Sequence, residues 1–387
     1  MSAKFLKTPT YMKCEEAQEI IPHITLGPVI PDDWTLADFP EIGTNSADNT
    51  MVTITKMGND FIASTDLPVV NIFNVTTLEH IQVFDPKLSS TASSAHWRKE
   101  PGTDNMLNLH IKGTAGIWET LHLYRYPGGD LHNPQEVGNF HITHSTMIHM
   151  FSVTENYAIF FIYPISIDMT CAIEHLLHNL VECVRWYGDN TKTDIVVMSL
   201  ETGSVVSHTY TDGIYSTHHI NAYEESDGKT DLVVVDIVEA PWFAIVNYTD
   251  RDAMLNTEDT GAMSNDFVLN RYTIDLTHNA VSVSSWSNKQ NIPFINQFDF
   301  PLINPLYEGK PYCFAYGQAI VETKRQYLVK KNICDSSEDK VKGDTLKQLV
   351  LFKQHSFRFG LWRTIILGNP TLFLDQEQRR KMMGSCW

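Results

Sequence analysis

Three histidines occupy positions where a predicted strand meets a turn. His96 follows a run of small residues in SSAHWRKE, His149 lies in MIHMFSVTENYAIFF, and His218 lies in THHINAYEE. Imidazole is a common ligand of transition metals, so residues of this type could hold a metal ion. The three are dozens of residues apart and lack the HxH or HExxH spacing that places two ligands on one element. The residues alone leave two interpretations open, a metal site built from distant segments or ordinary structural histidines.

The other histidines carry weaker signals. The chain has 16 histidines, and most of them occur singly in strand-like contexts. A neutral imidazole that is satisfied by one hydrogen bond is the ordinary outcome there. His175 and His178 have a helical spacing that could form a metal pair, but no carboxylate or third histidine is near them in the pattern. We interpret both as ordinary surface or core residues.

The elements that must position the three histidines are predicted to be strands. Strand-sized segments separated by short turn clusters recur through most of the chain. The predicted strands are residues 51–57, 61–65, 107–111, 117–126, 194–200, 205–210, 231–240, 267–276, 281–286, 326–333 and 346–354. A meander of four-stranded units favours a β-propeller, although two packed sheets would give much the same pattern. In a propeller, inward strand ends from different blades would bring distant histidines to one axis.

One segment shows helical periodicity. From Cys171 to Tyr187, apolar residues recur at spacings of three and four, which predicts one amphipathic helix. We expect it to cover the propeller or pack in an insertion, and a membrane-facing helix is the alternative. No apolar run is long enough to span a bilayer, while attachment to a membrane surface remains open.

Composition limits the class of protein. The chain has 387 residues, 43% hydrophobic and 19% charged, which is typical of a globular protein with a large core. Its formal net charge of -17 opposes binding to phosphates, so we expect no nucleic-acid partner. The six cysteines form no CxxC pair and no apolar leader follows the first residues, so we expect reduced thiols in a cytoplasmic chain.

The sequence resembles the carotenoid cleavage oxygenase family over roughly residues 5–353. The segments that carry the resemblance are SADNTMVTITKMGNDFIASTD with NVTTLE, SSAHW, IHMFSVTENYAIFF, THHINAYEE with LVVVDIV, and NQFDFPLINPLYEGKPYCFAYG. The resemblance implies an all-β, seven-bladed propeller with helical or loop cover over an axial metal site. We expect one propeller domain over residues 1–387, with a divergent tail at 354–387. The family's N-terminal blade segment and its closing motifs have no match, so we expect the propeller to be incomplete.

The resemblance also implies a metal site. The family holds Fe(II) with four histidines, each from a different blade, and leaves open positions for O₂. By motif, His96, His149 and His218 correspond to three of the four ligands. His218 is chosen over His219 because the family ligand stands three residues before the Asn, and adjacent strand residues face opposite ways. His355 follows Asp299, but its setting does not match the family's fourth ligand, so it receives no role.

Two aspartates occupy positions where the family has glutamates that accept hydrogen bonds from the ligand rings. These residues are Asp66 in ASTD and Asp299 in QFDFP. Each side chain is one methylene shorter than glutamate, so we expect a longer bond, a backbone shift or an intervening water. The alternative is a plain turn or strand-end aspartate at either position.

The activity implied by the resemblance is cleavage of a C=C bond in a carotenoid or apocarotenoid by O₂, which gives aldehydes such as retinal. This reaction belongs to carotene catabolism and retinoid metabolism. Family position suggests tunnel residues, which are Thr65, Phe151, Phe294 and Phe298. Aromatic residues are also ordinary core residues, so a packing role is the alternative for these side chains.

The segment PDDWTLADF corresponds to the family's membrane-contacting region and contains Trp34, Leu36 and Phe39. It predicts peripheral association with an intracellular membrane, and an exposed loop is the alternative. Two rival functions also remain. The same iron site could serve a retinyl-ester isomerohydrolase or cleave stilbene-like substrates. A non-catalytic paralogue that binds a carotenoid or retinoid would also explain the unmatched fourth ligand.

Overall fold

The computed structural model describes residues 4–18, 48, 50, 52–114, 118–142, 144, 146–174, 180–226, 228–240, 267–285, 298–321 and 325–334. Five antiparallel sheets dominate this part of the chain, and we number them as blades 1 to 5 in chain order. Blade 1 contains β1 (Thr53–Met57), β2 (Asp60–Ser64), β3 (Val70–Phe73) and β4 (His80–Phe84). Blade 2 contains β5 (Ala92–Ser93), β6 (Arg98–Lys99), β7 (Met106–Thr114), β8 (Trp118–Tyr126) and β9 (Gln135–Ile142).

The later blades follow the same plan. Blade 3 contains β10 (Ser152–Val153), β11 (Tyr157–Ile162), β14 (Thr193–Ser199) and β15 (Val205–Thr211). Blade 4 contains β16 (Ser216–Ser226), β17 (Asp231–Glu239), β18 (Val268–Asp275) and β19 (Ala280–Ser285). Blade 5 contains β20 (Asp299–Leu302), β21 (Phe314–Val321) and β22 (Arg325–Asn332). The remaining elements are α1 (Pro9–Ala17), α2 (Met169–Glu174), the 3₁₀ turns η3 (Pro127–Gly129), η4 (Leu180–Cys183) and η6 (Pro305–Tyr307), and the paired strands β12 (Ile165–Ile167) and β13 (Val184–Trp186).

The predicted hairpins are present. Strands β1 and β2, β7 and β8, and β14 and β15 pair as antiparallel neighbours. The first hairpin turns at Gly58, whose φ of 56° is readily adopted only by a residue without a Cβ atom. The strand predicted at 346–354 lies outside the described residues.

Strand β11 shows how the sequence produces stacked blades. Its residues Ala158 to Ile162 are all buried, so both faces of the strand are covered. Phe160 packs in a hydrophobic cluster shared with blade 2, whereas its neighbour Phe161 packs in a cluster shared with blades 4 and 5. Because successive strand residues point to opposite faces, an uninterrupted apolar run can fill two interfaces at once.

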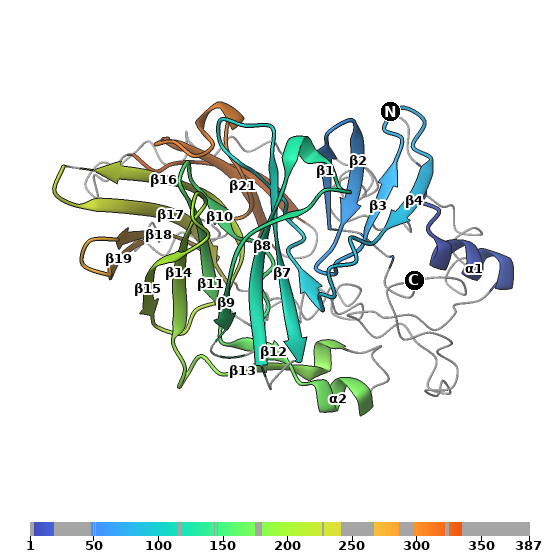
Figure 1. Ribbon diagram of the computed structural model, residues 1–387, viewed down its shortest axis with the longest axis horizontal. Coiled ribbons are helices and arrows are strands. Elements are labelled where there is room, and N and C mark those ends of the chain that lie inside the picture. Colours follow the sequence, from blue (N-terminus) through green and yellow to red (C-terminus); the bar gives the residue numbers. More distant parts are fainter. Residues whose placement is uncertain are drawn as a thin grey trace.

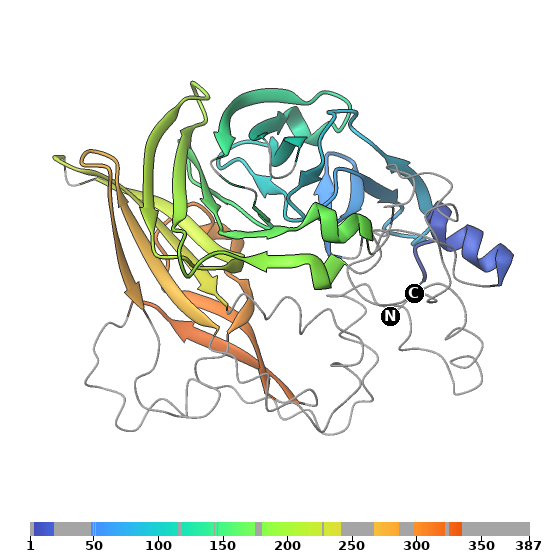
Figure 2. The same cartoon turned by 90° about the horizontal axis from the view of Figure 1, so that it is seen from below.

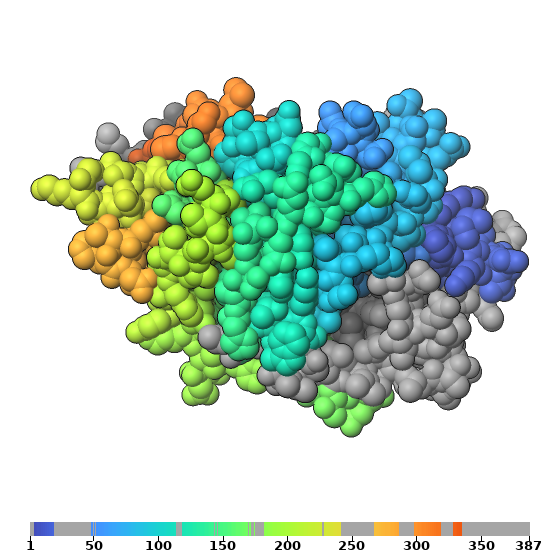
Figure 3. Space-filling view, viewed as in Figure 1, coloured from blue at the N-terminus to red at the C-terminus, as the bar shows by residue number. Residues whose placement is uncertain are grey.

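The core consists of clusters that lie between successive blades. One cluster joins blades 1 and 2, another joins blades 2 and 3, and the largest joins blades 3, 4 and 5. The sheets therefore stack side by side in chain order, and they form an arc when seen from below (Figures 1 and 2). Figure 3 shows blades 1 to 3 side by side across one face, from blue through teal to green. The fold is an all-β propeller with five described blades, and a seven-bladed ring stays a prediction.

Motifs that carried the family resemblance contact each other across blades 3 and 4. Asn156, from the TENY motif, donates from its backbone and side chain to the carboxylate of Glu224, from NAYEE, at 2.8 Å in both cases. Asn221 of the same NAYEE motif donates its amide to the carbonyl oxygens of Tyr307 and Lys310, each at 3.0 Å. These side chains join successive blades and the loop that follows β20.

The prediction of one helix from Cys171 to Tyr187 is wrong. Helix α2 ends at Glu174, η4 covers Leu180–Cys183, and Val184–Trp186 forms β13, which pairs with β12. A continuous helix would separate residues 171 and 183 by about 18 Å. Instead Cys171 and Cys183 form a disulfide with Cα atoms 5.5 Å apart. The chain therefore turns back on itself, and His175 and His178 lie outside the described residues.

The expectation of reduced thiols is also wrong. Cys313 is bonded to Cys334, Cys14 is disulfide-bonded, and the described residues include no free cysteine. Cysteines that are far apart in sequence meet only when strands pair, so sequence spacing did not reveal these bonds. Disulfides persist mainly in oxidising compartments, which removes the argument for a cytoplasmic chain. No helix in the described ranges has the length and apolar character needed to cross a bilayer.

Candidate metal centre

The inner strands of four successive blades bring the predicted residues to one axis. His96 lies between β5 and β6, His149 lies just before β10, His218 lies near the start of β16, and Asp299 begins β20. Strands β6, β10, β16 and β20 are neighbours in that order, although they come from different sheets. Equivalent positions of consecutive blades therefore converge, which explains why the residues are so far apart in sequence.

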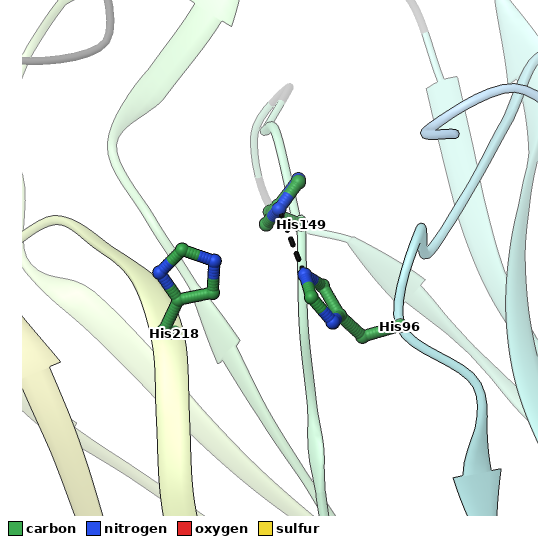
Figure 4. Close-up of side chains that lie close together, drawn as sticks. All are labelled: His96, His149 and His218. Carbon is green, nitrogen blue, oxygen red and sulfur yellow. Dashed lines mark hydrogen bonds between the residues drawn. The ribbon is translucent and has the colours of Figure 1, made fainter. Parts of the chain in front are cut away.

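The three histidine rings surround a common point (Figure 4). One ligand nitrogen from each of His96, His149 and His218 lies within 4.8 Å of the others, and this is the one such group among the described residues. The Nε2 atoms of His96 and His149 are 3.0 Å apart. Two imidazoles at right angles, each with a metal–nitrogen bond of about 2.1 Å, would have their nitrogens about 3.0 Å apart. The spacing therefore fits two adjacent ligands of one ion.

Strand β16 directs the side chains of His218 and His219 to different sides. Its register with β17 shifts between Ser216 and His218 and again between His219 and Asn221. These β-bulges flank the histidine pair and orient its side chains. His218 faces the axis. His219 is 1% exposed, and its ring nitrogens form hydrogen bonds with Ser152 Oγ at 2.7 Å and with Tyr163 OH at 3.0 Å. Only His218 can contribute to the axial cluster, as strand alternation led us to expect.

Both predicted aspartates contact axial histidine rings directly. His149 Nδ1 lies 2.8 and 2.9 Å from the carboxylate oxygens of Asp66, and His218 Nδ1 lies 2.7 Å from Asp299 Oδ1. An ionised carboxylate can only accept, so each Nδ1 carries a proton, and in the neutral ring each Nε2 then keeps its lone pair. This is the tautomer that a metal ion requires when Nε2 is the ligand atom.

The backbone is irregular where the short Asp299 side chain contacts its histidine. The pairing of β20 with β21 changes register between Asp299 and Leu302, and Phe300 has a φ of 50°. A positive φ is unfavourable for a bulky residue and costs about 1–3 kcal/mol. Phe300 also places its ring 5.2 Å from that of His218. Of the three outcomes expected for a shortened carboxylate, a longer bond and an intervening water are wrong.

The environment gives the axial rings different proton affinities. Burial lowers the pKa of His96 well below its usual value, and the neighbouring His149 and His218 lower it further. Burial also lowers the pKa of His149, but the Asp66 carboxylate and its hydrogen bond raise it, and the resulting pKa is above the ordinary value. His96 is therefore neutral near pH 7, as a metal ligand must be.

The donor set therefore fits a transition-metal ion such as Fe(II). One buried and two half-buried imidazoles converge on one point, two of them have their tautomer fixed by carboxylates, and the rings lie nearly perpendicular to each other, with angles of 73° to 87°. Nitrogen donors of this type suit iron, zinc or copper, whereas magnesium and calcium prefer oxygen.

The predicted tunnel residues do not contribute to the metal-site argument. Phe151 and Phe298 are fully buried in the hydrophobic clusters, which favours a packing role, and Thr65 is half-buried beside Asp66. Phe294, His355 and the segment 31–39 with Trp34, Leu36 and Phe39 lie outside the described residues. A pocket of 410 Å³ contains none of the axial residues and is lined partly by Lys192, Asp194 and His208, a polar lining that does not suit a polyene.

Sequence reasoning missed the residues that hold the ligand backbones. Ser94 and Ser216 are buried, and each stands two residues before an axial histidine. Their hydroxyls lie 3.2 Å from the carbonyl oxygens of His96 and His218, respectively. The repeated Ser-x-His spacing, in SSAH and STHH, was the available signal.

Comparisons with known proteins identify the family of the chain. Residues 1–360 match the family model described as retinal pigment epithelial membrane protein. A carotenoid isomerooxygenase from Galleria mellonella is 27% identical over 252 residues, which are 60% of this chain and 47% of the relative. A β,β-carotene 15,15'-dioxygenase from Mus musculus is 22% identical over 369 residues, covering 82% of this chain and 63% of the relative. The chain thus spans less than two thirds of the length of these relatives.

Solved structures show the same fold. Cobalt-substituted ACO from Synechocystis superposes with a TM-score of 0.65 at 20% sequence identity, covering 85% of this chain and 66% of the other. An ACO/RPE65 chimera gives a TM-score of 0.64 at 19% identity over the same shares of the two chains. With the propeller, the axial histidines and the family match over residues 1–360 in agreement, the chain belongs to the retinal pigment epithelial membrane protein family, which includes the carotenoid oxygenases.

Proposed function

We propose that the protein holds Fe(II) through His96, His149 and His218 and cleaves a C=C bond of a carotenoid or apocarotenoid with O₂. The products would be two aldehydes, such as retinal. The reaction balances without another reductant, because one C=C bond and O₂ become two C=O bonds. The observation that carries the proposal is the convergence of the three rings, with Asp66 and Asp299 bonded to two of them.

The residues around the ion would have different roles in this reaction. The Asp66 and Asp299 carboxylates hold the Nδ1 protons of His149 and His218, which leaves their Nε2 lone pairs for the ion. The ion would supply the redox chemistry that lets O₂ react with a polyene. Apolar surroundings would exclude water and orient the double bond, and a long polyene would be taken from a membrane by peripheral contact.

Metal content after anaerobic purification is the first test. We would compare the parent chain with His149→Ala and with His141→Ala, a matched control because His141 is exposed and lies outside the axial cluster. We expect near-stoichiometric iron in the parent and the control, and none in His149→Ala. Iron that persists in His149→Ala, or no iron in the parent under iron-replete expression, would contradict the proposal.

Product analysis is the second test. The iron-loaded protein would be incubated with β-carotene, an apocarotenal, a stilbene and a retinyl ester, and the products identified by mass spectrometry. Aldehydes carrying oxygen from ¹⁸O₂ support cleavage of a carotenoid or stilbene. An isomerised retinol would instead identify an isomerohydrolase, and a bound but unchanged polyene would identify a non-catalytic binding protein.

A further inference from the structure

The hydroxyl of Ser94 connects the backbones of two axial histidines. The His96 amide donates to Ser94 Oγ at 3.1 Å, and Ser94 Oγ donates to the carbonyl oxygen of His149 at 2.8 Å. The alternative acceptor, the His96 carbonyl, is farther away at 3.2 Å, and a hydroxyl has a single proton to give. Ser94 is 0% exposed, so no water competes for these bonds. One side chain thus bridges residues that come from blades 2 and 3.

The preceding serine connects the same segment to blade 1. The Ser93 amide donates to the Asp66 carbonyl at 2.9 Å, and Ser93 Oγ donates to the Leu67 carbonyl at 2.8 Å. Asp66 in turn accepts from the ring of His149. The contacts therefore form a closed circuit that runs through Ser93, Asp66, His149 and Ser94. A shift of His149 would have to break at least one of these hydrogen bonds.

Ser216 provides a comparison within the same molecule. It is also buried and also stands two residues before an axial histidine, but its hydroxyl contacts the carbonyl of that same residue, His218, and the side chain of Tyr163. Ser216 therefore shapes one bulge, whereas Ser94 fixes the position of one ligand relative to another. The separation of His96 Nε2 and His149 Nε2, 3.0 Å, is the quantity that this bridge would control.

We propose that Ser94 is a positioning residue of the metal centre, whose hydroxyl sets the distance between His96 and His149. This inference rests on the proposed metal-binding function. Catalytic and metal constellations tolerate displacements of only about 0.5 Å, so losing the bridge would weaken metal binding more than it weakens the fold. Ser94 does not touch the ion and acts through the two ligands.

The test is Co(II) titration of the metal-free protein, followed by its visible absorption. We would compare Ser94→Ala with Ser207→Ala, a control in which a buried hydroxyl loses a bond to Asn279 that lies at the contact between blades 3 and 4. Partners of metal ligands typically contribute about 10–100-fold to affinity, so we expect a loss of at least about tenfold in Ser94→Ala. Ser207→Ala should keep the parent affinity and spectrum at a similar melting temperature.

A second pair isolates the hydroxyl if Ser94→Ala does not fold. Thr and Val have nearly the same shape, so Ser94→Thr should bind Co(II) more tightly than Ser94→Val. Equal affinity in that pair, or equal losses in Ser94→Ala and Ser207→Ala, would overturn the proposal.

A metal-free measurement separates this inference from the proposed function. If the parent binds no Co(II), the metal centre itself is refuted. The ¹⁵N signals of the His149 ring would still test the bridge, because Ser94→Ala should displace His149, weaken the hydrogen bond from its Nδ1 to Asp66 and shift the Nδ1 signal. An unchanged Nδ1 signal would overturn the role of Ser94.

Discussion

The axial histidines and the histidines of the blade interior differ, within the described residues, in what their ring nitrogens contact. The axial residues His149 and His218 give Nδ1 to an aspartate and direct Nε2 at the other axial rings. In the blade interior, His110 contacts Ser90 through Nδ1 and Tyr126 through Nε2, and His219 contacts Ser152 and Tyr163 in the same way. Both nitrogens of the interior rings are therefore occupied by hydroxyls.

The difference shows what makes a histidine competent as a ligand. Burial lowers the pKa of His110 and of His219 to about 3, and the cations Lys112 and Arg98, respectively, lower it further. The pKa of His149 is raised by Asp66 in spite of its burial. A neutral ring with both nitrogens bonded to hydroxyls is a structural residue, whereas a ring with a carboxylate on Nδ1 and an Nε2 that faces other imidazoles can bind a metal.

The largest effect should follow from removing an axial ring. We expect His218→Ala to lose metal affinity by more than the roughly 100-fold that outer partners contribute, because a ligand itself is lost. His110→Gln should keep the parent affinity, since His110 lies in the blade interior. Isothermal titration with Co(II) measures both. Equal losses in the two variants would mean that the distinction between axial and interior rings is wrong.

Loss of the disulfide in blade 5 should affect the end of the arc that carries Asp299. Asp299 belongs to blade 5, whose strands are joined at one end by Cys313–Cys334. Closing a loop of this size contributes about 3 kcal/mol, so the double variant Cys313→Ser/Cys334→Ser should lose about 3 kcal/mol of unfolding free energy and unfold at a lower denaturant concentration. Its metal affinity should fall as well. Free thiols in the untreated parent, measured with a thiol reagent, would contradict the disulfide.

The two aspartates should differ in their contribution to metal binding. The Asp299 side chain is 8% exposed and that of Asp66 is 40% exposed. Water can partly replace an exposed carboxylate but not a buried one. We expect Asp299→Asn to lower Co(II) affinity about 10–100-fold and Asp66→Asn to lower it less. The reverse order would show that exposure does not govern the strength of these pairs.

The interior histidines should make the fold sensitive to acid. His110 has a pKa of about 3 when folded and would have one of about 6.5 when unfolded, so the unfolded chain binds the extra proton between these values. Its contribution to stability is present above pH 6.5 and is lost as the pH falls towards 3, at about 1.4 kcal/mol per pH unit. Lys112 and His122 are the charged groups that add to this shift.

Urea unfolding at several pH values would measure the slope. In His110→Gln, the slope of the unfolding free energy against pH between pH 6.5 and 4 should be smaller by about 1.4 kcal/mol per pH unit, which is the contribution of one proton. A slope that is the same in the variant and the parent would mean that groups other than His110 cause the acid sensitivity.

The strands were the most predictable part of the molecule. Hairpins such as β1–β2 are predicted by short strand-like runs on either side of a Gly-Asn turn, and these signals are local in the sequence. The segment after Cys171 was mispredicted because helical periodicity is also local, whereas the Cys171–Cys183 bond and the pairing of β13 with β12 are not. The axial residues were identified by family motif, since their spacing in sequence gives no metal-site signal.

The sequence by itself determined where strands form, which strands are apolar on both faces, and which family the motifs resemble. Those properties depend on residues that are neighbours along the chain. The tertiary structure decided that the three axial histidines meet, that Asp299 contacts the ring of His218 directly, and that Ser94 connects two of the axial histidines. Each of these depends on contacts between blades, and such contacts exist only after residues dozens of positions apart have packed together.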